Sequence, residues 1–181
     1  MDQRDEQEFA DYFAARRDAV RRTAYLICGD WHRADDLAQA AFVALHRRWS
    51  KIRDKGALDA YVRRTLVRAA IDESRRPWRR EHAAEVLPEA ASDAIGFDAV
   101  GDSVATRSAL VNGLQRVPPR QRAVLVLRFY EGMPDDEIAQ VLGCRPGTVR
   151  SNVSRALATL RIGMAELAHS TPESVTTPRE A

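Results

Sequence analysis

The chain has 181 residues, of which 45% are hydrophobic and 30% charged, enough for one domain or two small ones. No apolar run approaches the ~18 residues of a membrane span, and the first residues lack the apolar core of a signal peptide. The net charge of +2 hides a pattern. Residues 1–80 carry 18 Arg and Lys against 13 acids, residues 81–106 carry 6 acids and no base, and residues 107–169 carry 9 bases against 5 acids. Basic lobes favour a polyanionic partner, although charge alone fits a solvated surface equally well.

Motifs of catalysis and metal binding are missing from the sequence. The 2 cysteines, Cys28 and Cys144, lie far apart and are expected to be reduced and packed, and the 4 histidines show no ligand spacing. The sequence contains no Gly-rich phosphate loop, nucleophile elbow or paired-carboxylate motif. We therefore expect a cytoplasmic protein that is not an enzyme and holds neither metal nor cofactor.

Helical periodicity dominates the first part of the chain. Apolar residues recur at three- and four-residue spacing, and strand-like alternation is absent, which predicts a small helical bundle. Trp49 and Tyr61 could both be simple core residues of this bundle. A flexible linker is expected where the chain becomes Ala-rich and one-sidedly acidic. The predicted helices are residues 8–29, 32–52 and 58–75, followed by the linker at 81–101.

The second part returns to regular helical patterning. Pro119 can occupy the first position of a helix, and the acids at 135–137 fall in a first turn, where the helix dipole favours them. The last twelve or so residues have no core-forming side chains, which predicts a disordered tail. The predicted helices are residues 102–116, 119–130 and 135–142 and one that begins at Pro146. The fold class expected is all-α, with two small helical domains joined by the flexible linker.

The last two predicted helices, joined by a Gly-containing turn, form a helix-turn-helix. Val149, Val153 and Leu157 give the second helix an inner face, and at ~100° per residue its opposite face carries Arg and small hydroxyls. Arg bonds guanine or phosphate, and Ser and Thr suit phosphate or either base type. A solvated surface helix, the alternative, would more often mix Glu and Lys. The candidate DNA contacts are Thr148, Arg150, Ser151, Ser154 and Arg155.

Two stretches resemble a known family. "LQRVPPRQRAVLVLRFYEGMPDDEIAQVLGCRPGTVRSNVSRALATLR" resembles the C-terminal domain of bacterial sigma factors, which recognises the −35 promoter element. "ADDLAQAAFVALHRRW" resembles the N-terminal sigma helix that grips RNA polymerase. Two such domains with only a linker between them resemble the extracytoplasmic-function class. The resemblance covers about residues 9–168. It implies a polymerase-binding and −10-recognising domain at 1–80, an acidic linker at 81–101, a −35-recognising domain at 102–168 and a tail at 169–181.

The resemblance also implies roles for individual residues. In the C-terminal domain, Arg128 matches a basic position that braces the DNA backbone, beside the five candidates above. Asp35, Asp36 and Gln39 match the polar region that docks on the β′ clamp helices of polymerase. Ala40 stands where the family often has Glu, which removes one charge from that contact. Pro134 stands where a capping Ser or Thr is usual, so either Asp135 caps the next helix or Pro134 opens it.

For the −10 element, the loop at residues 51–58 matches the segment that captures a flipped base. Arg68 stands where relatives often have Asn, which leaves open whether it meets base or phosphate. The −10 candidates are Lys51, Arg53, Tyr61, Arg64 and Arg68.

The function expected is therefore that of a sigma factor without catalysis of its own. Its implied partners are core RNA polymerase, through the β′ clamp helices and the β flap, promoter DNA, and an anti-sigma factor where one exists. It is expected to be a monomer when free and to act with polymerase at the nucleoid. A dimeric DNA-binding regulator would share the helix-turn-helix but would not explain Asp36, Gln39 or the loop at 51–58. A small helical enzyme or metal protein would need clustered His, Cys or carboxylates.

Overall fold

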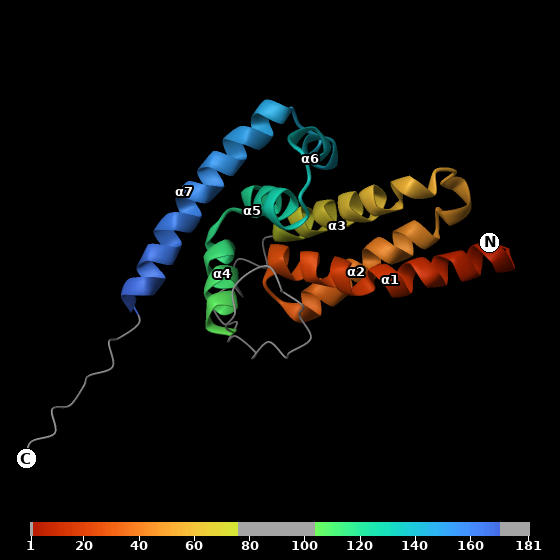
Figure 1. Ribbon diagram of the computed structural model, residues 1–181, viewed down its shortest axis with the longest axis horizontal. Helices are drawn as coiled ribbons and strands as arrows, with labels where there is room; N and C mark the ends of the chain where they lie inside the picture. Colours follow the sequence, from red (N-terminus) through yellow and green to blue (C-terminus); the bar gives the residue numbers. More distant parts are fainter. Residues whose placement is uncertain (1, 76–103, 171–181) are drawn as a thin grey trace, which may run out of the picture.

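A computed structural model of the chain describes residues 2–75 and 104–170, which form helices and turns without a β-strand among them (Figure 1). The expected all-α fold with two helical domains is confirmed. The predicted linker and residues 171–181 of the predicted tail lie outside the described residues. The N-terminal bundle consists of α1 (Gln3–Cys28), α2 (Trp31–His46) and α3 (Leu58–Ser74), and the C-terminal domain of α4 (Val104–Arg116), α5 (Pro119–Leu125), α6 (Asp135–Leu142) and α7 (Pro146–Ser170).

Adjacent residues end α1 and begin α2. Gly29 adopts a left-handed backbone with φ of 77°, and its N–H donates to the Tyr25 carbonyl, which is the common way to close a helix. Asp30 then serves as N-cap, because its carboxylate accepts from the Arg33 N–H at 2.8 Å. The two helices consequently form an antiparallel pair, against which α3 packs.

The predicted helix at residues 32–52 is too long. The α-helix ends at His46, and a short 3-10 turn, Trp49–Lys51, follows it. Trp49 follows the α-helix and is only 1% exposed, and it meets the ring of Phe9 edge-on at a centroid distance of 5.2 Å. Because Trp49 lies four residues after the buried Leu45, the apolar stripe of the helix continues past His46, and the pattern alone does not mark where the α-helix ends. Trp49 is therefore a core residue, and Tyr61 is half-buried.

The predicted helix at residues 119–130 is α-helical only in its first half. After α5 the chain continues as a π-helix, Val126–Tyr130, in which the Glu131 N–H donates to the carbonyl of Val126, five residues back. Gly132, with φ of 66°, ends it. Such π-turns are rare and commonly occur at functional positions. Here the wider turn directs Glu131 toward the N-terminal bundle, where its carboxylate accepts from the Arg63 Nε of α3 at 2.9 Å.

One hydrophobic cluster runs through both domains, so the N-terminal bundle and the C-terminal domain pack against each other. A charged group is buried at this junction: the Arg122 side chain is only 7% exposed. Its guanidinium donates to the Ile27 carbonyl at 2.6 Å, at the C-terminal end of α1, and to the Gln115 and Val117 carbonyls at 3.1 Å. Burial lowers the pKa of Arg122 to about 10, so the group stays charged at neutral pH and interacts favourably with the negative end of the α1 dipole.

None of the helices within residues 2–75 and 104–170 combines the length and the apolar character that crossing a bilayer requires.

Candidate functional site

The helix-turn-helix is formed by α6 and α7, with both boundaries where the sequence predicts them. Gly143 closes α6 in the left-handed conformation, with φ of 62°, and its N–H donates to the Ala139 carbonyl. Pro134 precedes α6 without a side-chain capping bond, and Asp135 is the first helical residue. Of the two alternatives left by the sequence, Pro134 therefore opens the helix and Asp135 does not cap it.

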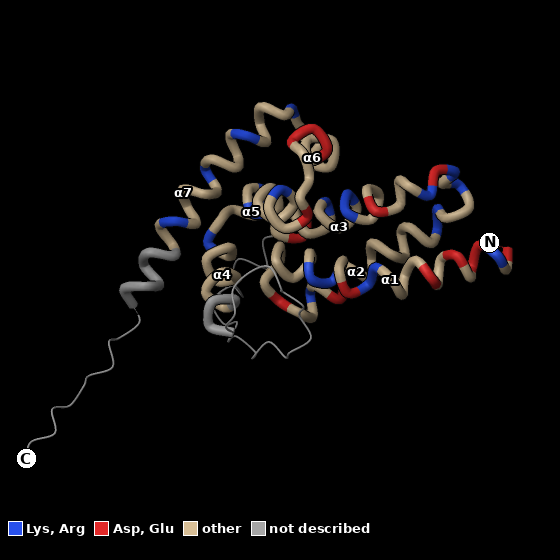
Figure 2. The backbone as a smooth tube through the Cα atoms, viewed as in Figure 1, with Lys and Arg blue, Asp and Glu red and all other residues tan. Residues whose placement is uncertain are grey.

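All five helix positions predicted to meet DNA are exposed on α7, and the inner face is buried through Val149 and Ala156. Ser151 already donates to the Thr148 carbonyl at 3.0 Å, so its hydroxyl oxygen remains free to accept. In Figure 2 the basic positions follow one another along α7, and the acids gather at the start of α6. From Thr148 to Arg161 the exposed face of α7 therefore presents Arg and small hydroxyls with no carboxylate between them.

Asp135 joins two of the predicted DNA contacts. Arg128, in the π-helix, forms an ion pair with one Asp135 oxygen, and the Arg150 Nη1 lies 3.8 Å from the other. Both arginines thus point toward the start of α6 from different elements. Asp135 was not predicted to take part in DNA contact, although its position in the first turn was the available signal.

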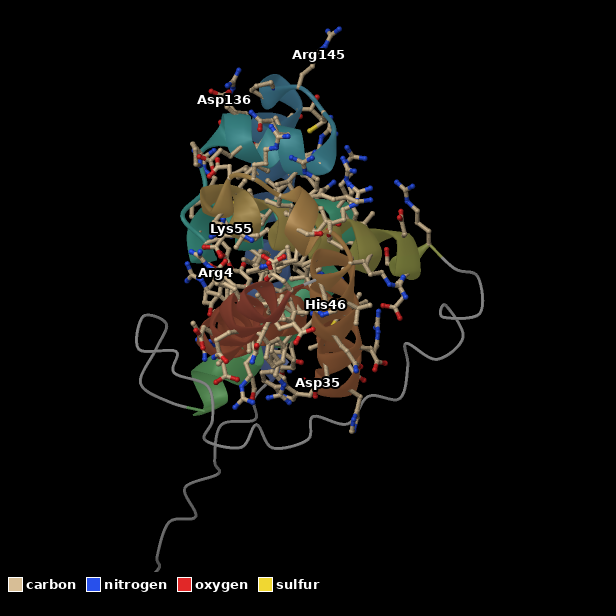
Figure 3. All side chains as sticks on the ribbon, turned by 90° about the vertical axis from the view of Figure 1, so that its right-hand side faces the viewer. Arg4, Asp35, His46, Lys55, Asp136 and Arg145 are labelled. Atoms are coloured by element: carbon tan, nitrogen blue, oxygen red, sulfur yellow. The ribbon has the colours of Figure 1, made fainter. Side chains whose placement is uncertain are left out.

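Arg145 is a second residue that the sequence interpretation missed. It lies in the turn before α7 and is exposed. Figure 3 shows Arg145 projecting from the end of the molecule where α6 begins, near Asp136, and Asp35 at the opposite end of that view. An Arg directly before a helix N-terminus adds charge where that terminus already attracts phosphate. Its place in "GCRP" could have identified it.

The predicted flipped-base loop lies between α2 and α3 and exposes Lys51 and Arg53. Asp54 organises it by accepting from the Gly56 N–H at 2.8 Å. Lys55 anchors it, since its ammonium lies 3.9 Å from the centroid of the buried Trp49 ring and 4.0 Å from a Glu8 oxygen. The loop is thus held against α1 and α2, and Lys51 and Arg53 stay exposed.

The three predicted −10 residues on α3 differ in their surroundings. Arg64 and Arg68 are exposed and share a face, being four residues apart. Tyr61 is half-buried, and its hydroxyl donates to the Ala44 carbonyl at 3.4 Å. The Arg68 Nε donates to the Val141 carbonyl of α6 at 3.3 Å, a contact across the two domains that the sequence did not predict.

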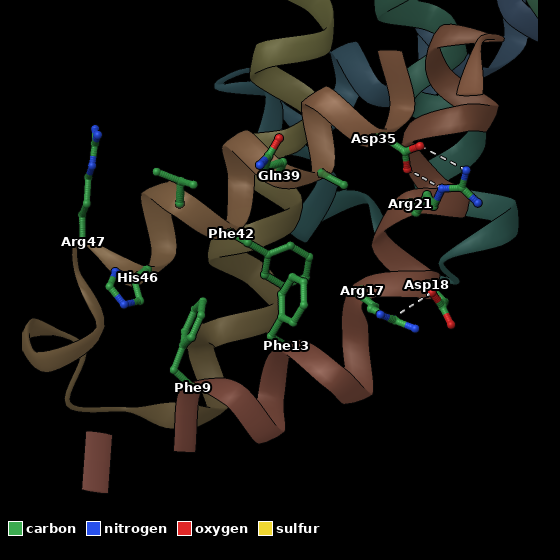
Figure 4. A pocket seen from close by; sticks show the side chains of 12 residues that line it. Phe9, Phe13, Arg17, Asp18, Arg21, Asp35, Gln39, Phe42, His46 and Arg47 are labelled. Atoms are coloured by element: carbon green, nitrogen blue, oxygen red, sulfur yellow. Dashed lines mark hydrogen bonds and ion pairs between the residues drawn. The ribbon is translucent and has the colours of Figure 1, made fainter. Parts of the chain in front are cut away.

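A groove of about 800 Å³ lies between α1 and α2 on the face away from α3. Figure 4 shows its apolar floor, Phe9, Phe13 and Phe42, with the rings of Phe13 and Phe42 edge-on at a centroid distance of 4.9 Å. Phe13 is 38% exposed and the neighbouring Val43 44% exposed. Large apolar groups left in contact with water at a groove indicate an interaction surface.

The groove includes two of the three predicted polymerase contacts. Asp35 and Gln39 line it, whereas Asp36 is exposed but is not among the lining residues. Asp35 forms a bidentate pair with Arg21, and this hydrogen bond raises the pKa of Arg21. Phe9 and Phe13 were not among the residues predicted to contact polymerase.

The described residues contain no group of three or more His, Cys, Asp or Glu side chains placed to hold a metal ion. The cysteines are free: Cys28 is buried and Cys144 half-buried.

Comparison with known proteins agrees with this architecture. Residues 12–80 match the family model of sigma-70 region 2, and residues 107–160 match that of sigma-70 region 4. The RNA polymerase sigma-E factor of Streptomyces coelicolor is 37% identical over 154 residues, covering 85% of this chain and 84% of the relative. The ECF RNA polymerase sigma factor SigM of Mycobacterium tuberculosis is 30% identical over 158 residues, covering 86% and 76%.

A solved structure shares the fold. The sigma factor RpoE of Bartonella quintana, crystallised with the anti-sigma factor NepR, matches with a TM-score of 0.68 at 20% identity, covering 92% of this chain and 99% of that one.

A helical bundle matching region 2 and a helix-turn-helix domain matching region 4 define a transcription initiation factor. The chain belongs to the RNA polymerase sigma factors of the extracytoplasmic-function class. It recognises promoters for RNA polymerase and is not itself an enzyme, as the sequence predicted.

Proposed function

We propose that the C-terminal domain reads the −35 element with α7. The supporting observation is the carboxylate-free face of exposed Arg and hydroxyl side chains on that helix. Arg150 and Arg155 are the candidates for base edges or phosphates, and the hydroxyls of Thr148, Ser151 and Ser154 allow close approach of the backbone. Arg128 braces the DNA backbone beside them, with Asp135 setting the direction of its guanidinium.

The N-terminal bundle, proposed as residues 1–80, captures the −10 element. Extruding a base costs a few kcal/mol of unstacking, which a polar loop and contacts to the strand must offset. Lys51 and Arg53 supply charge in the loop, and Arg64 and Arg68 supply it along α3. Tyr61 is half-buried, so we assign it to the wall of the base pocket rather than to an open stacking platform.

The groove between α1 and α2 is the proposed docking surface for the β′ clamp helices of core polymerase. Its aromatic floor supplies apolar contact, and Asp35 and Gln39 supply polar contact at the rim, with Asp36 next to them. The C-terminal domain in turn meets the β flap. The two surfaces and the DNA-reading helix would then hold one polymerase and one promoter together.

An anti-sigma factor is a further proposed partner. The sigma factor RpoE of Bartonella quintana is seen in complex with one, and the exposed Phe13 and Val43 here offer a surface that such a partner could cover. The protein would act in the cytoplasm with polymerase at the nucleoid, as a monomer when free of it.

The direct test is transcription in vitro with core polymerase on a library of genomic fragments. The expected result is initiation that depends on this protein, from fragments sharing a −35 and a −10 motif. Gel filtration supplies the contrast, since a dimer that binds duplex DNA but ignores core polymerase would identify an ordinary DNA-binding regulator instead.

A further inference from the structure

Two residues of α1 face two residues of α2 close to the turn that joins these helices. Arg21 and Tyr25 lie one helical turn apart on α1, and Trp31 and Asp35 lie one turn apart on α2, so each pair shares a helix face. The Tyr25 and Trp31 rings are stacked, with centroids 3.9 Å apart and an interplanar angle of 3°. The guanidinium carbon of Arg21 lies 4.4 Å from the centroid of the Trp31 ring. We name these four residues the Trp31 cluster.

The Arg21 guanidinium joins this ring contact to a carboxylate. Its Nε donates to one Asp35 oxygen, and its Nη2 donates to the other at 3.1 Å (Figure 4). A two-point contact of this kind fixes the relative direction of both groups, which a single hydrogen bond does not. A guanidinium has more N–H donors, and a carboxylate more acceptor positions, than this pair uses. Asp35, whose side chain is 52% exposed, can therefore still accept from a partner protein.

An exposed ion pair holds its side chains loosely when nothing else supports it. Two long side chains lose rotamer freedom when they pair in water, and many such pairs contribute nothing measurable to stability. The Arg21 side chain is 38% exposed, so its pair with Asp35 needs further support. Trp31 supplies it, because a guanidinium is attracted to an indole face, and the half-buried indole is itself stacked on Tyr25. The Trp31 cluster therefore sets the direction of the Asp35 carboxylate.

Arg17 is a second arginine of the same groove and has different surroundings. It lies 3.4 Å from Asp18, its neighbour in the chain, so this ion pair stays within α1. Both side chains are well exposed, at 62% and 69%. Arg21, by contrast, connects α1 to the α2 carboxylate that we assigned to polymerase binding.

We infer that Trp31 is a positioning residue for the docking of core polymerase: it holds Arg21, and Arg21 holds the Asp35 carboxylate at the rim of the groove. Its role rests on the function proposed above for Asp35. A side chain that is fixed before binding loses less rotamer entropy on binding, so the affinity rises without a further contact. Trp31 is not among the residues that line the groove, and it acts on polymerase affinity through Asp35.

The affinity of the full chain for core polymerase, measured by fluorescence anisotropy of the labelled protein, tests this role. Trp31→Ala should weaken binding about fivefold, the effect expected for loss of a cation–π contact. Trp31→Phe keeps an aromatic face and should restore most of the affinity. Asp35→Ala should weaken binding as well, and adding Trp31→Ala to it should cost less than about twofold more, because the group that Trp31 positions is already gone. A merely structural role would cost the same in both backgrounds.

Arg21→Lys and Arg17→Lys are a matched pair of substitutions that retain the charge of the groove. Lysine has neither the flat fork nor the stacking surface of arginine. Arg21→Lys should therefore weaken binding about as much as Trp31→Ala, whereas Arg17→Lys should bind like the wild type. Circular dichroism and urea unfolding establish that the variants stay folded, and Arg21→Lys carries the comparison if Trp31→Ala loses helicity.

Nuclear magnetic resonance checks the cluster without polymerase. Protons above an indole face resonate upfield, so the Arg21 side-chain protons should be shifted upfield in the free protein and should return to ordinary positions in Trp31→Ala. Ordinary shifts in the wild type, wild-type affinity of Arg21→Lys, or equal losses from Trp31→Ala in the two backgrounds would each overturn the positioning role. In those cases a loss of affinity in Asp35→Ala would still support the docking role of Asp35. Wild-type affinity of Asp35→Ala would overturn both.

Discussion

Arg150 of the DNA-reading helix lies 3.8 Å from Asp135, the first residue of the preceding helix, and Arg128 pairs with the same carboxylate. An acid thus lies between two proposed DNA-binding arginines. It repels phosphate, yet it also limits the directions in which the guanidinium groups can point. Its own position is favourable, because the helix N-terminus attracts negative charge.

Asp135→Asn should therefore raise non-specific affinity and lower specificity. Duplexes of unrelated sequence should bind more tightly, because a negative charge is removed, while the ratio of −35 to random binding falls. The free energy of unfolding should drop by about 1 kcal/mol through loss of the ion pair and the helix-terminal charge. Fluorescence anisotropy over a salt series and urea unfolding measure these quantities. Asp136→Asn is the control, and an equal effect from it would show that only net charge matters.

Substitutions on α7 should separate base contacts from phosphate contacts. A base-reading Arg150 or Arg155 changed to Ala costs about 1–3 kcal/mol and relaxes preference at one base pair. A phosphate-binding Arg weakens all sequences alike and lowers the salt slope by about one. Ser154→Glu should weaken binding more than Ser154→Ala, because it adds charge against phosphate, and Arg161→Ala should do little. Wild-type binding of Arg150→Ala, Arg155→Ala and Ser154→Glu to −35 duplexes would exclude α7 as the reader.

Asp36→Arg should abolish binding to core polymerase and leave helicity and thermal stability nearly unchanged, since this side chain is exposed. Asp11→Arg is the matched charge reversal, at an exposed position of α1 about half a turn away from Phe9 and Phe13. Pull-down of core polymerase compares the two variants. The docking assignment fails if Asp36→Arg retains wild-type affinity or if Asp11→Arg loses it equally.

Replacing residues 51–58 by a Gly and Ser loop should block promoter opening and spare polymerase binding. The replacement removes Lys51 and Arg53 from the proposed pocket and also the Lys55 contact with Trp49. Permanganate reactivity of unpaired thymines reports opening on linear and pre-melted templates. The pre-melted template should restore only part of the activity, because base capture is lost together with melting. Full activity on linear DNA would make the loop a mere connector.

The thiol of Cys28 should make stability depend on pH. Burial raises its pKa to about 11, well above the ordinary value of a cysteine thiol. The folded protein keeps this proton when the unfolded chain has lost it, so the contribution is complete below about pH 9 and is lost as the pH rises through about 11. Relative to Cys28→Ala, the free energy of unfolding should fall by about 1.4 kcal/mol per pH unit in that window. Urea unfolding across it gives the slope, and a difference independent of pH would contradict the assignment.

Local signals predicted much of the fold. The boundaries of α6 and the start of α7 follow from acids in a first turn, from Gly143 and from Pro146, each of which acts within a few residues. Errors arose where distant residues decide the backbone. The apolar stripe runs on to Trp49 although the α-helix ends at His46, and the π-helix directs Glu131 to a partner 68 residues away.

In the candidate site too, features within a single helix were predicted, and features formed by several elements were missed. The exposed face of α7 follows from helical periodicity alone, so all five of its predicted residues lie where expected. The groove was missed because its floor comes from two helices, and neither helix shows by itself that Phe13 and Val43 stay uncovered. The contact of Arg68 with α6 depends on how the domains pack, which no short stretch of sequence encodes.

Gly29 has a consequence for how this protein can evolve. A Cβ there would need a left-handed backbone and would overlap the Gln115 side chain, whose Nε2 lies 2.6 Å from the Cβ position. Gln115 cannot easily move aside, because its side-chain oxygen accepts from the buried Arg122. Any replacement of Gly29 would therefore require a smaller residue at 115, and Arg122 would keep only its backbone carbonyl acceptors, those of Ile27, Gln115 and Val117. Positions 29, 115 and 122 should change together among descendants or not at all, although 86 residues separate the first two in the chain.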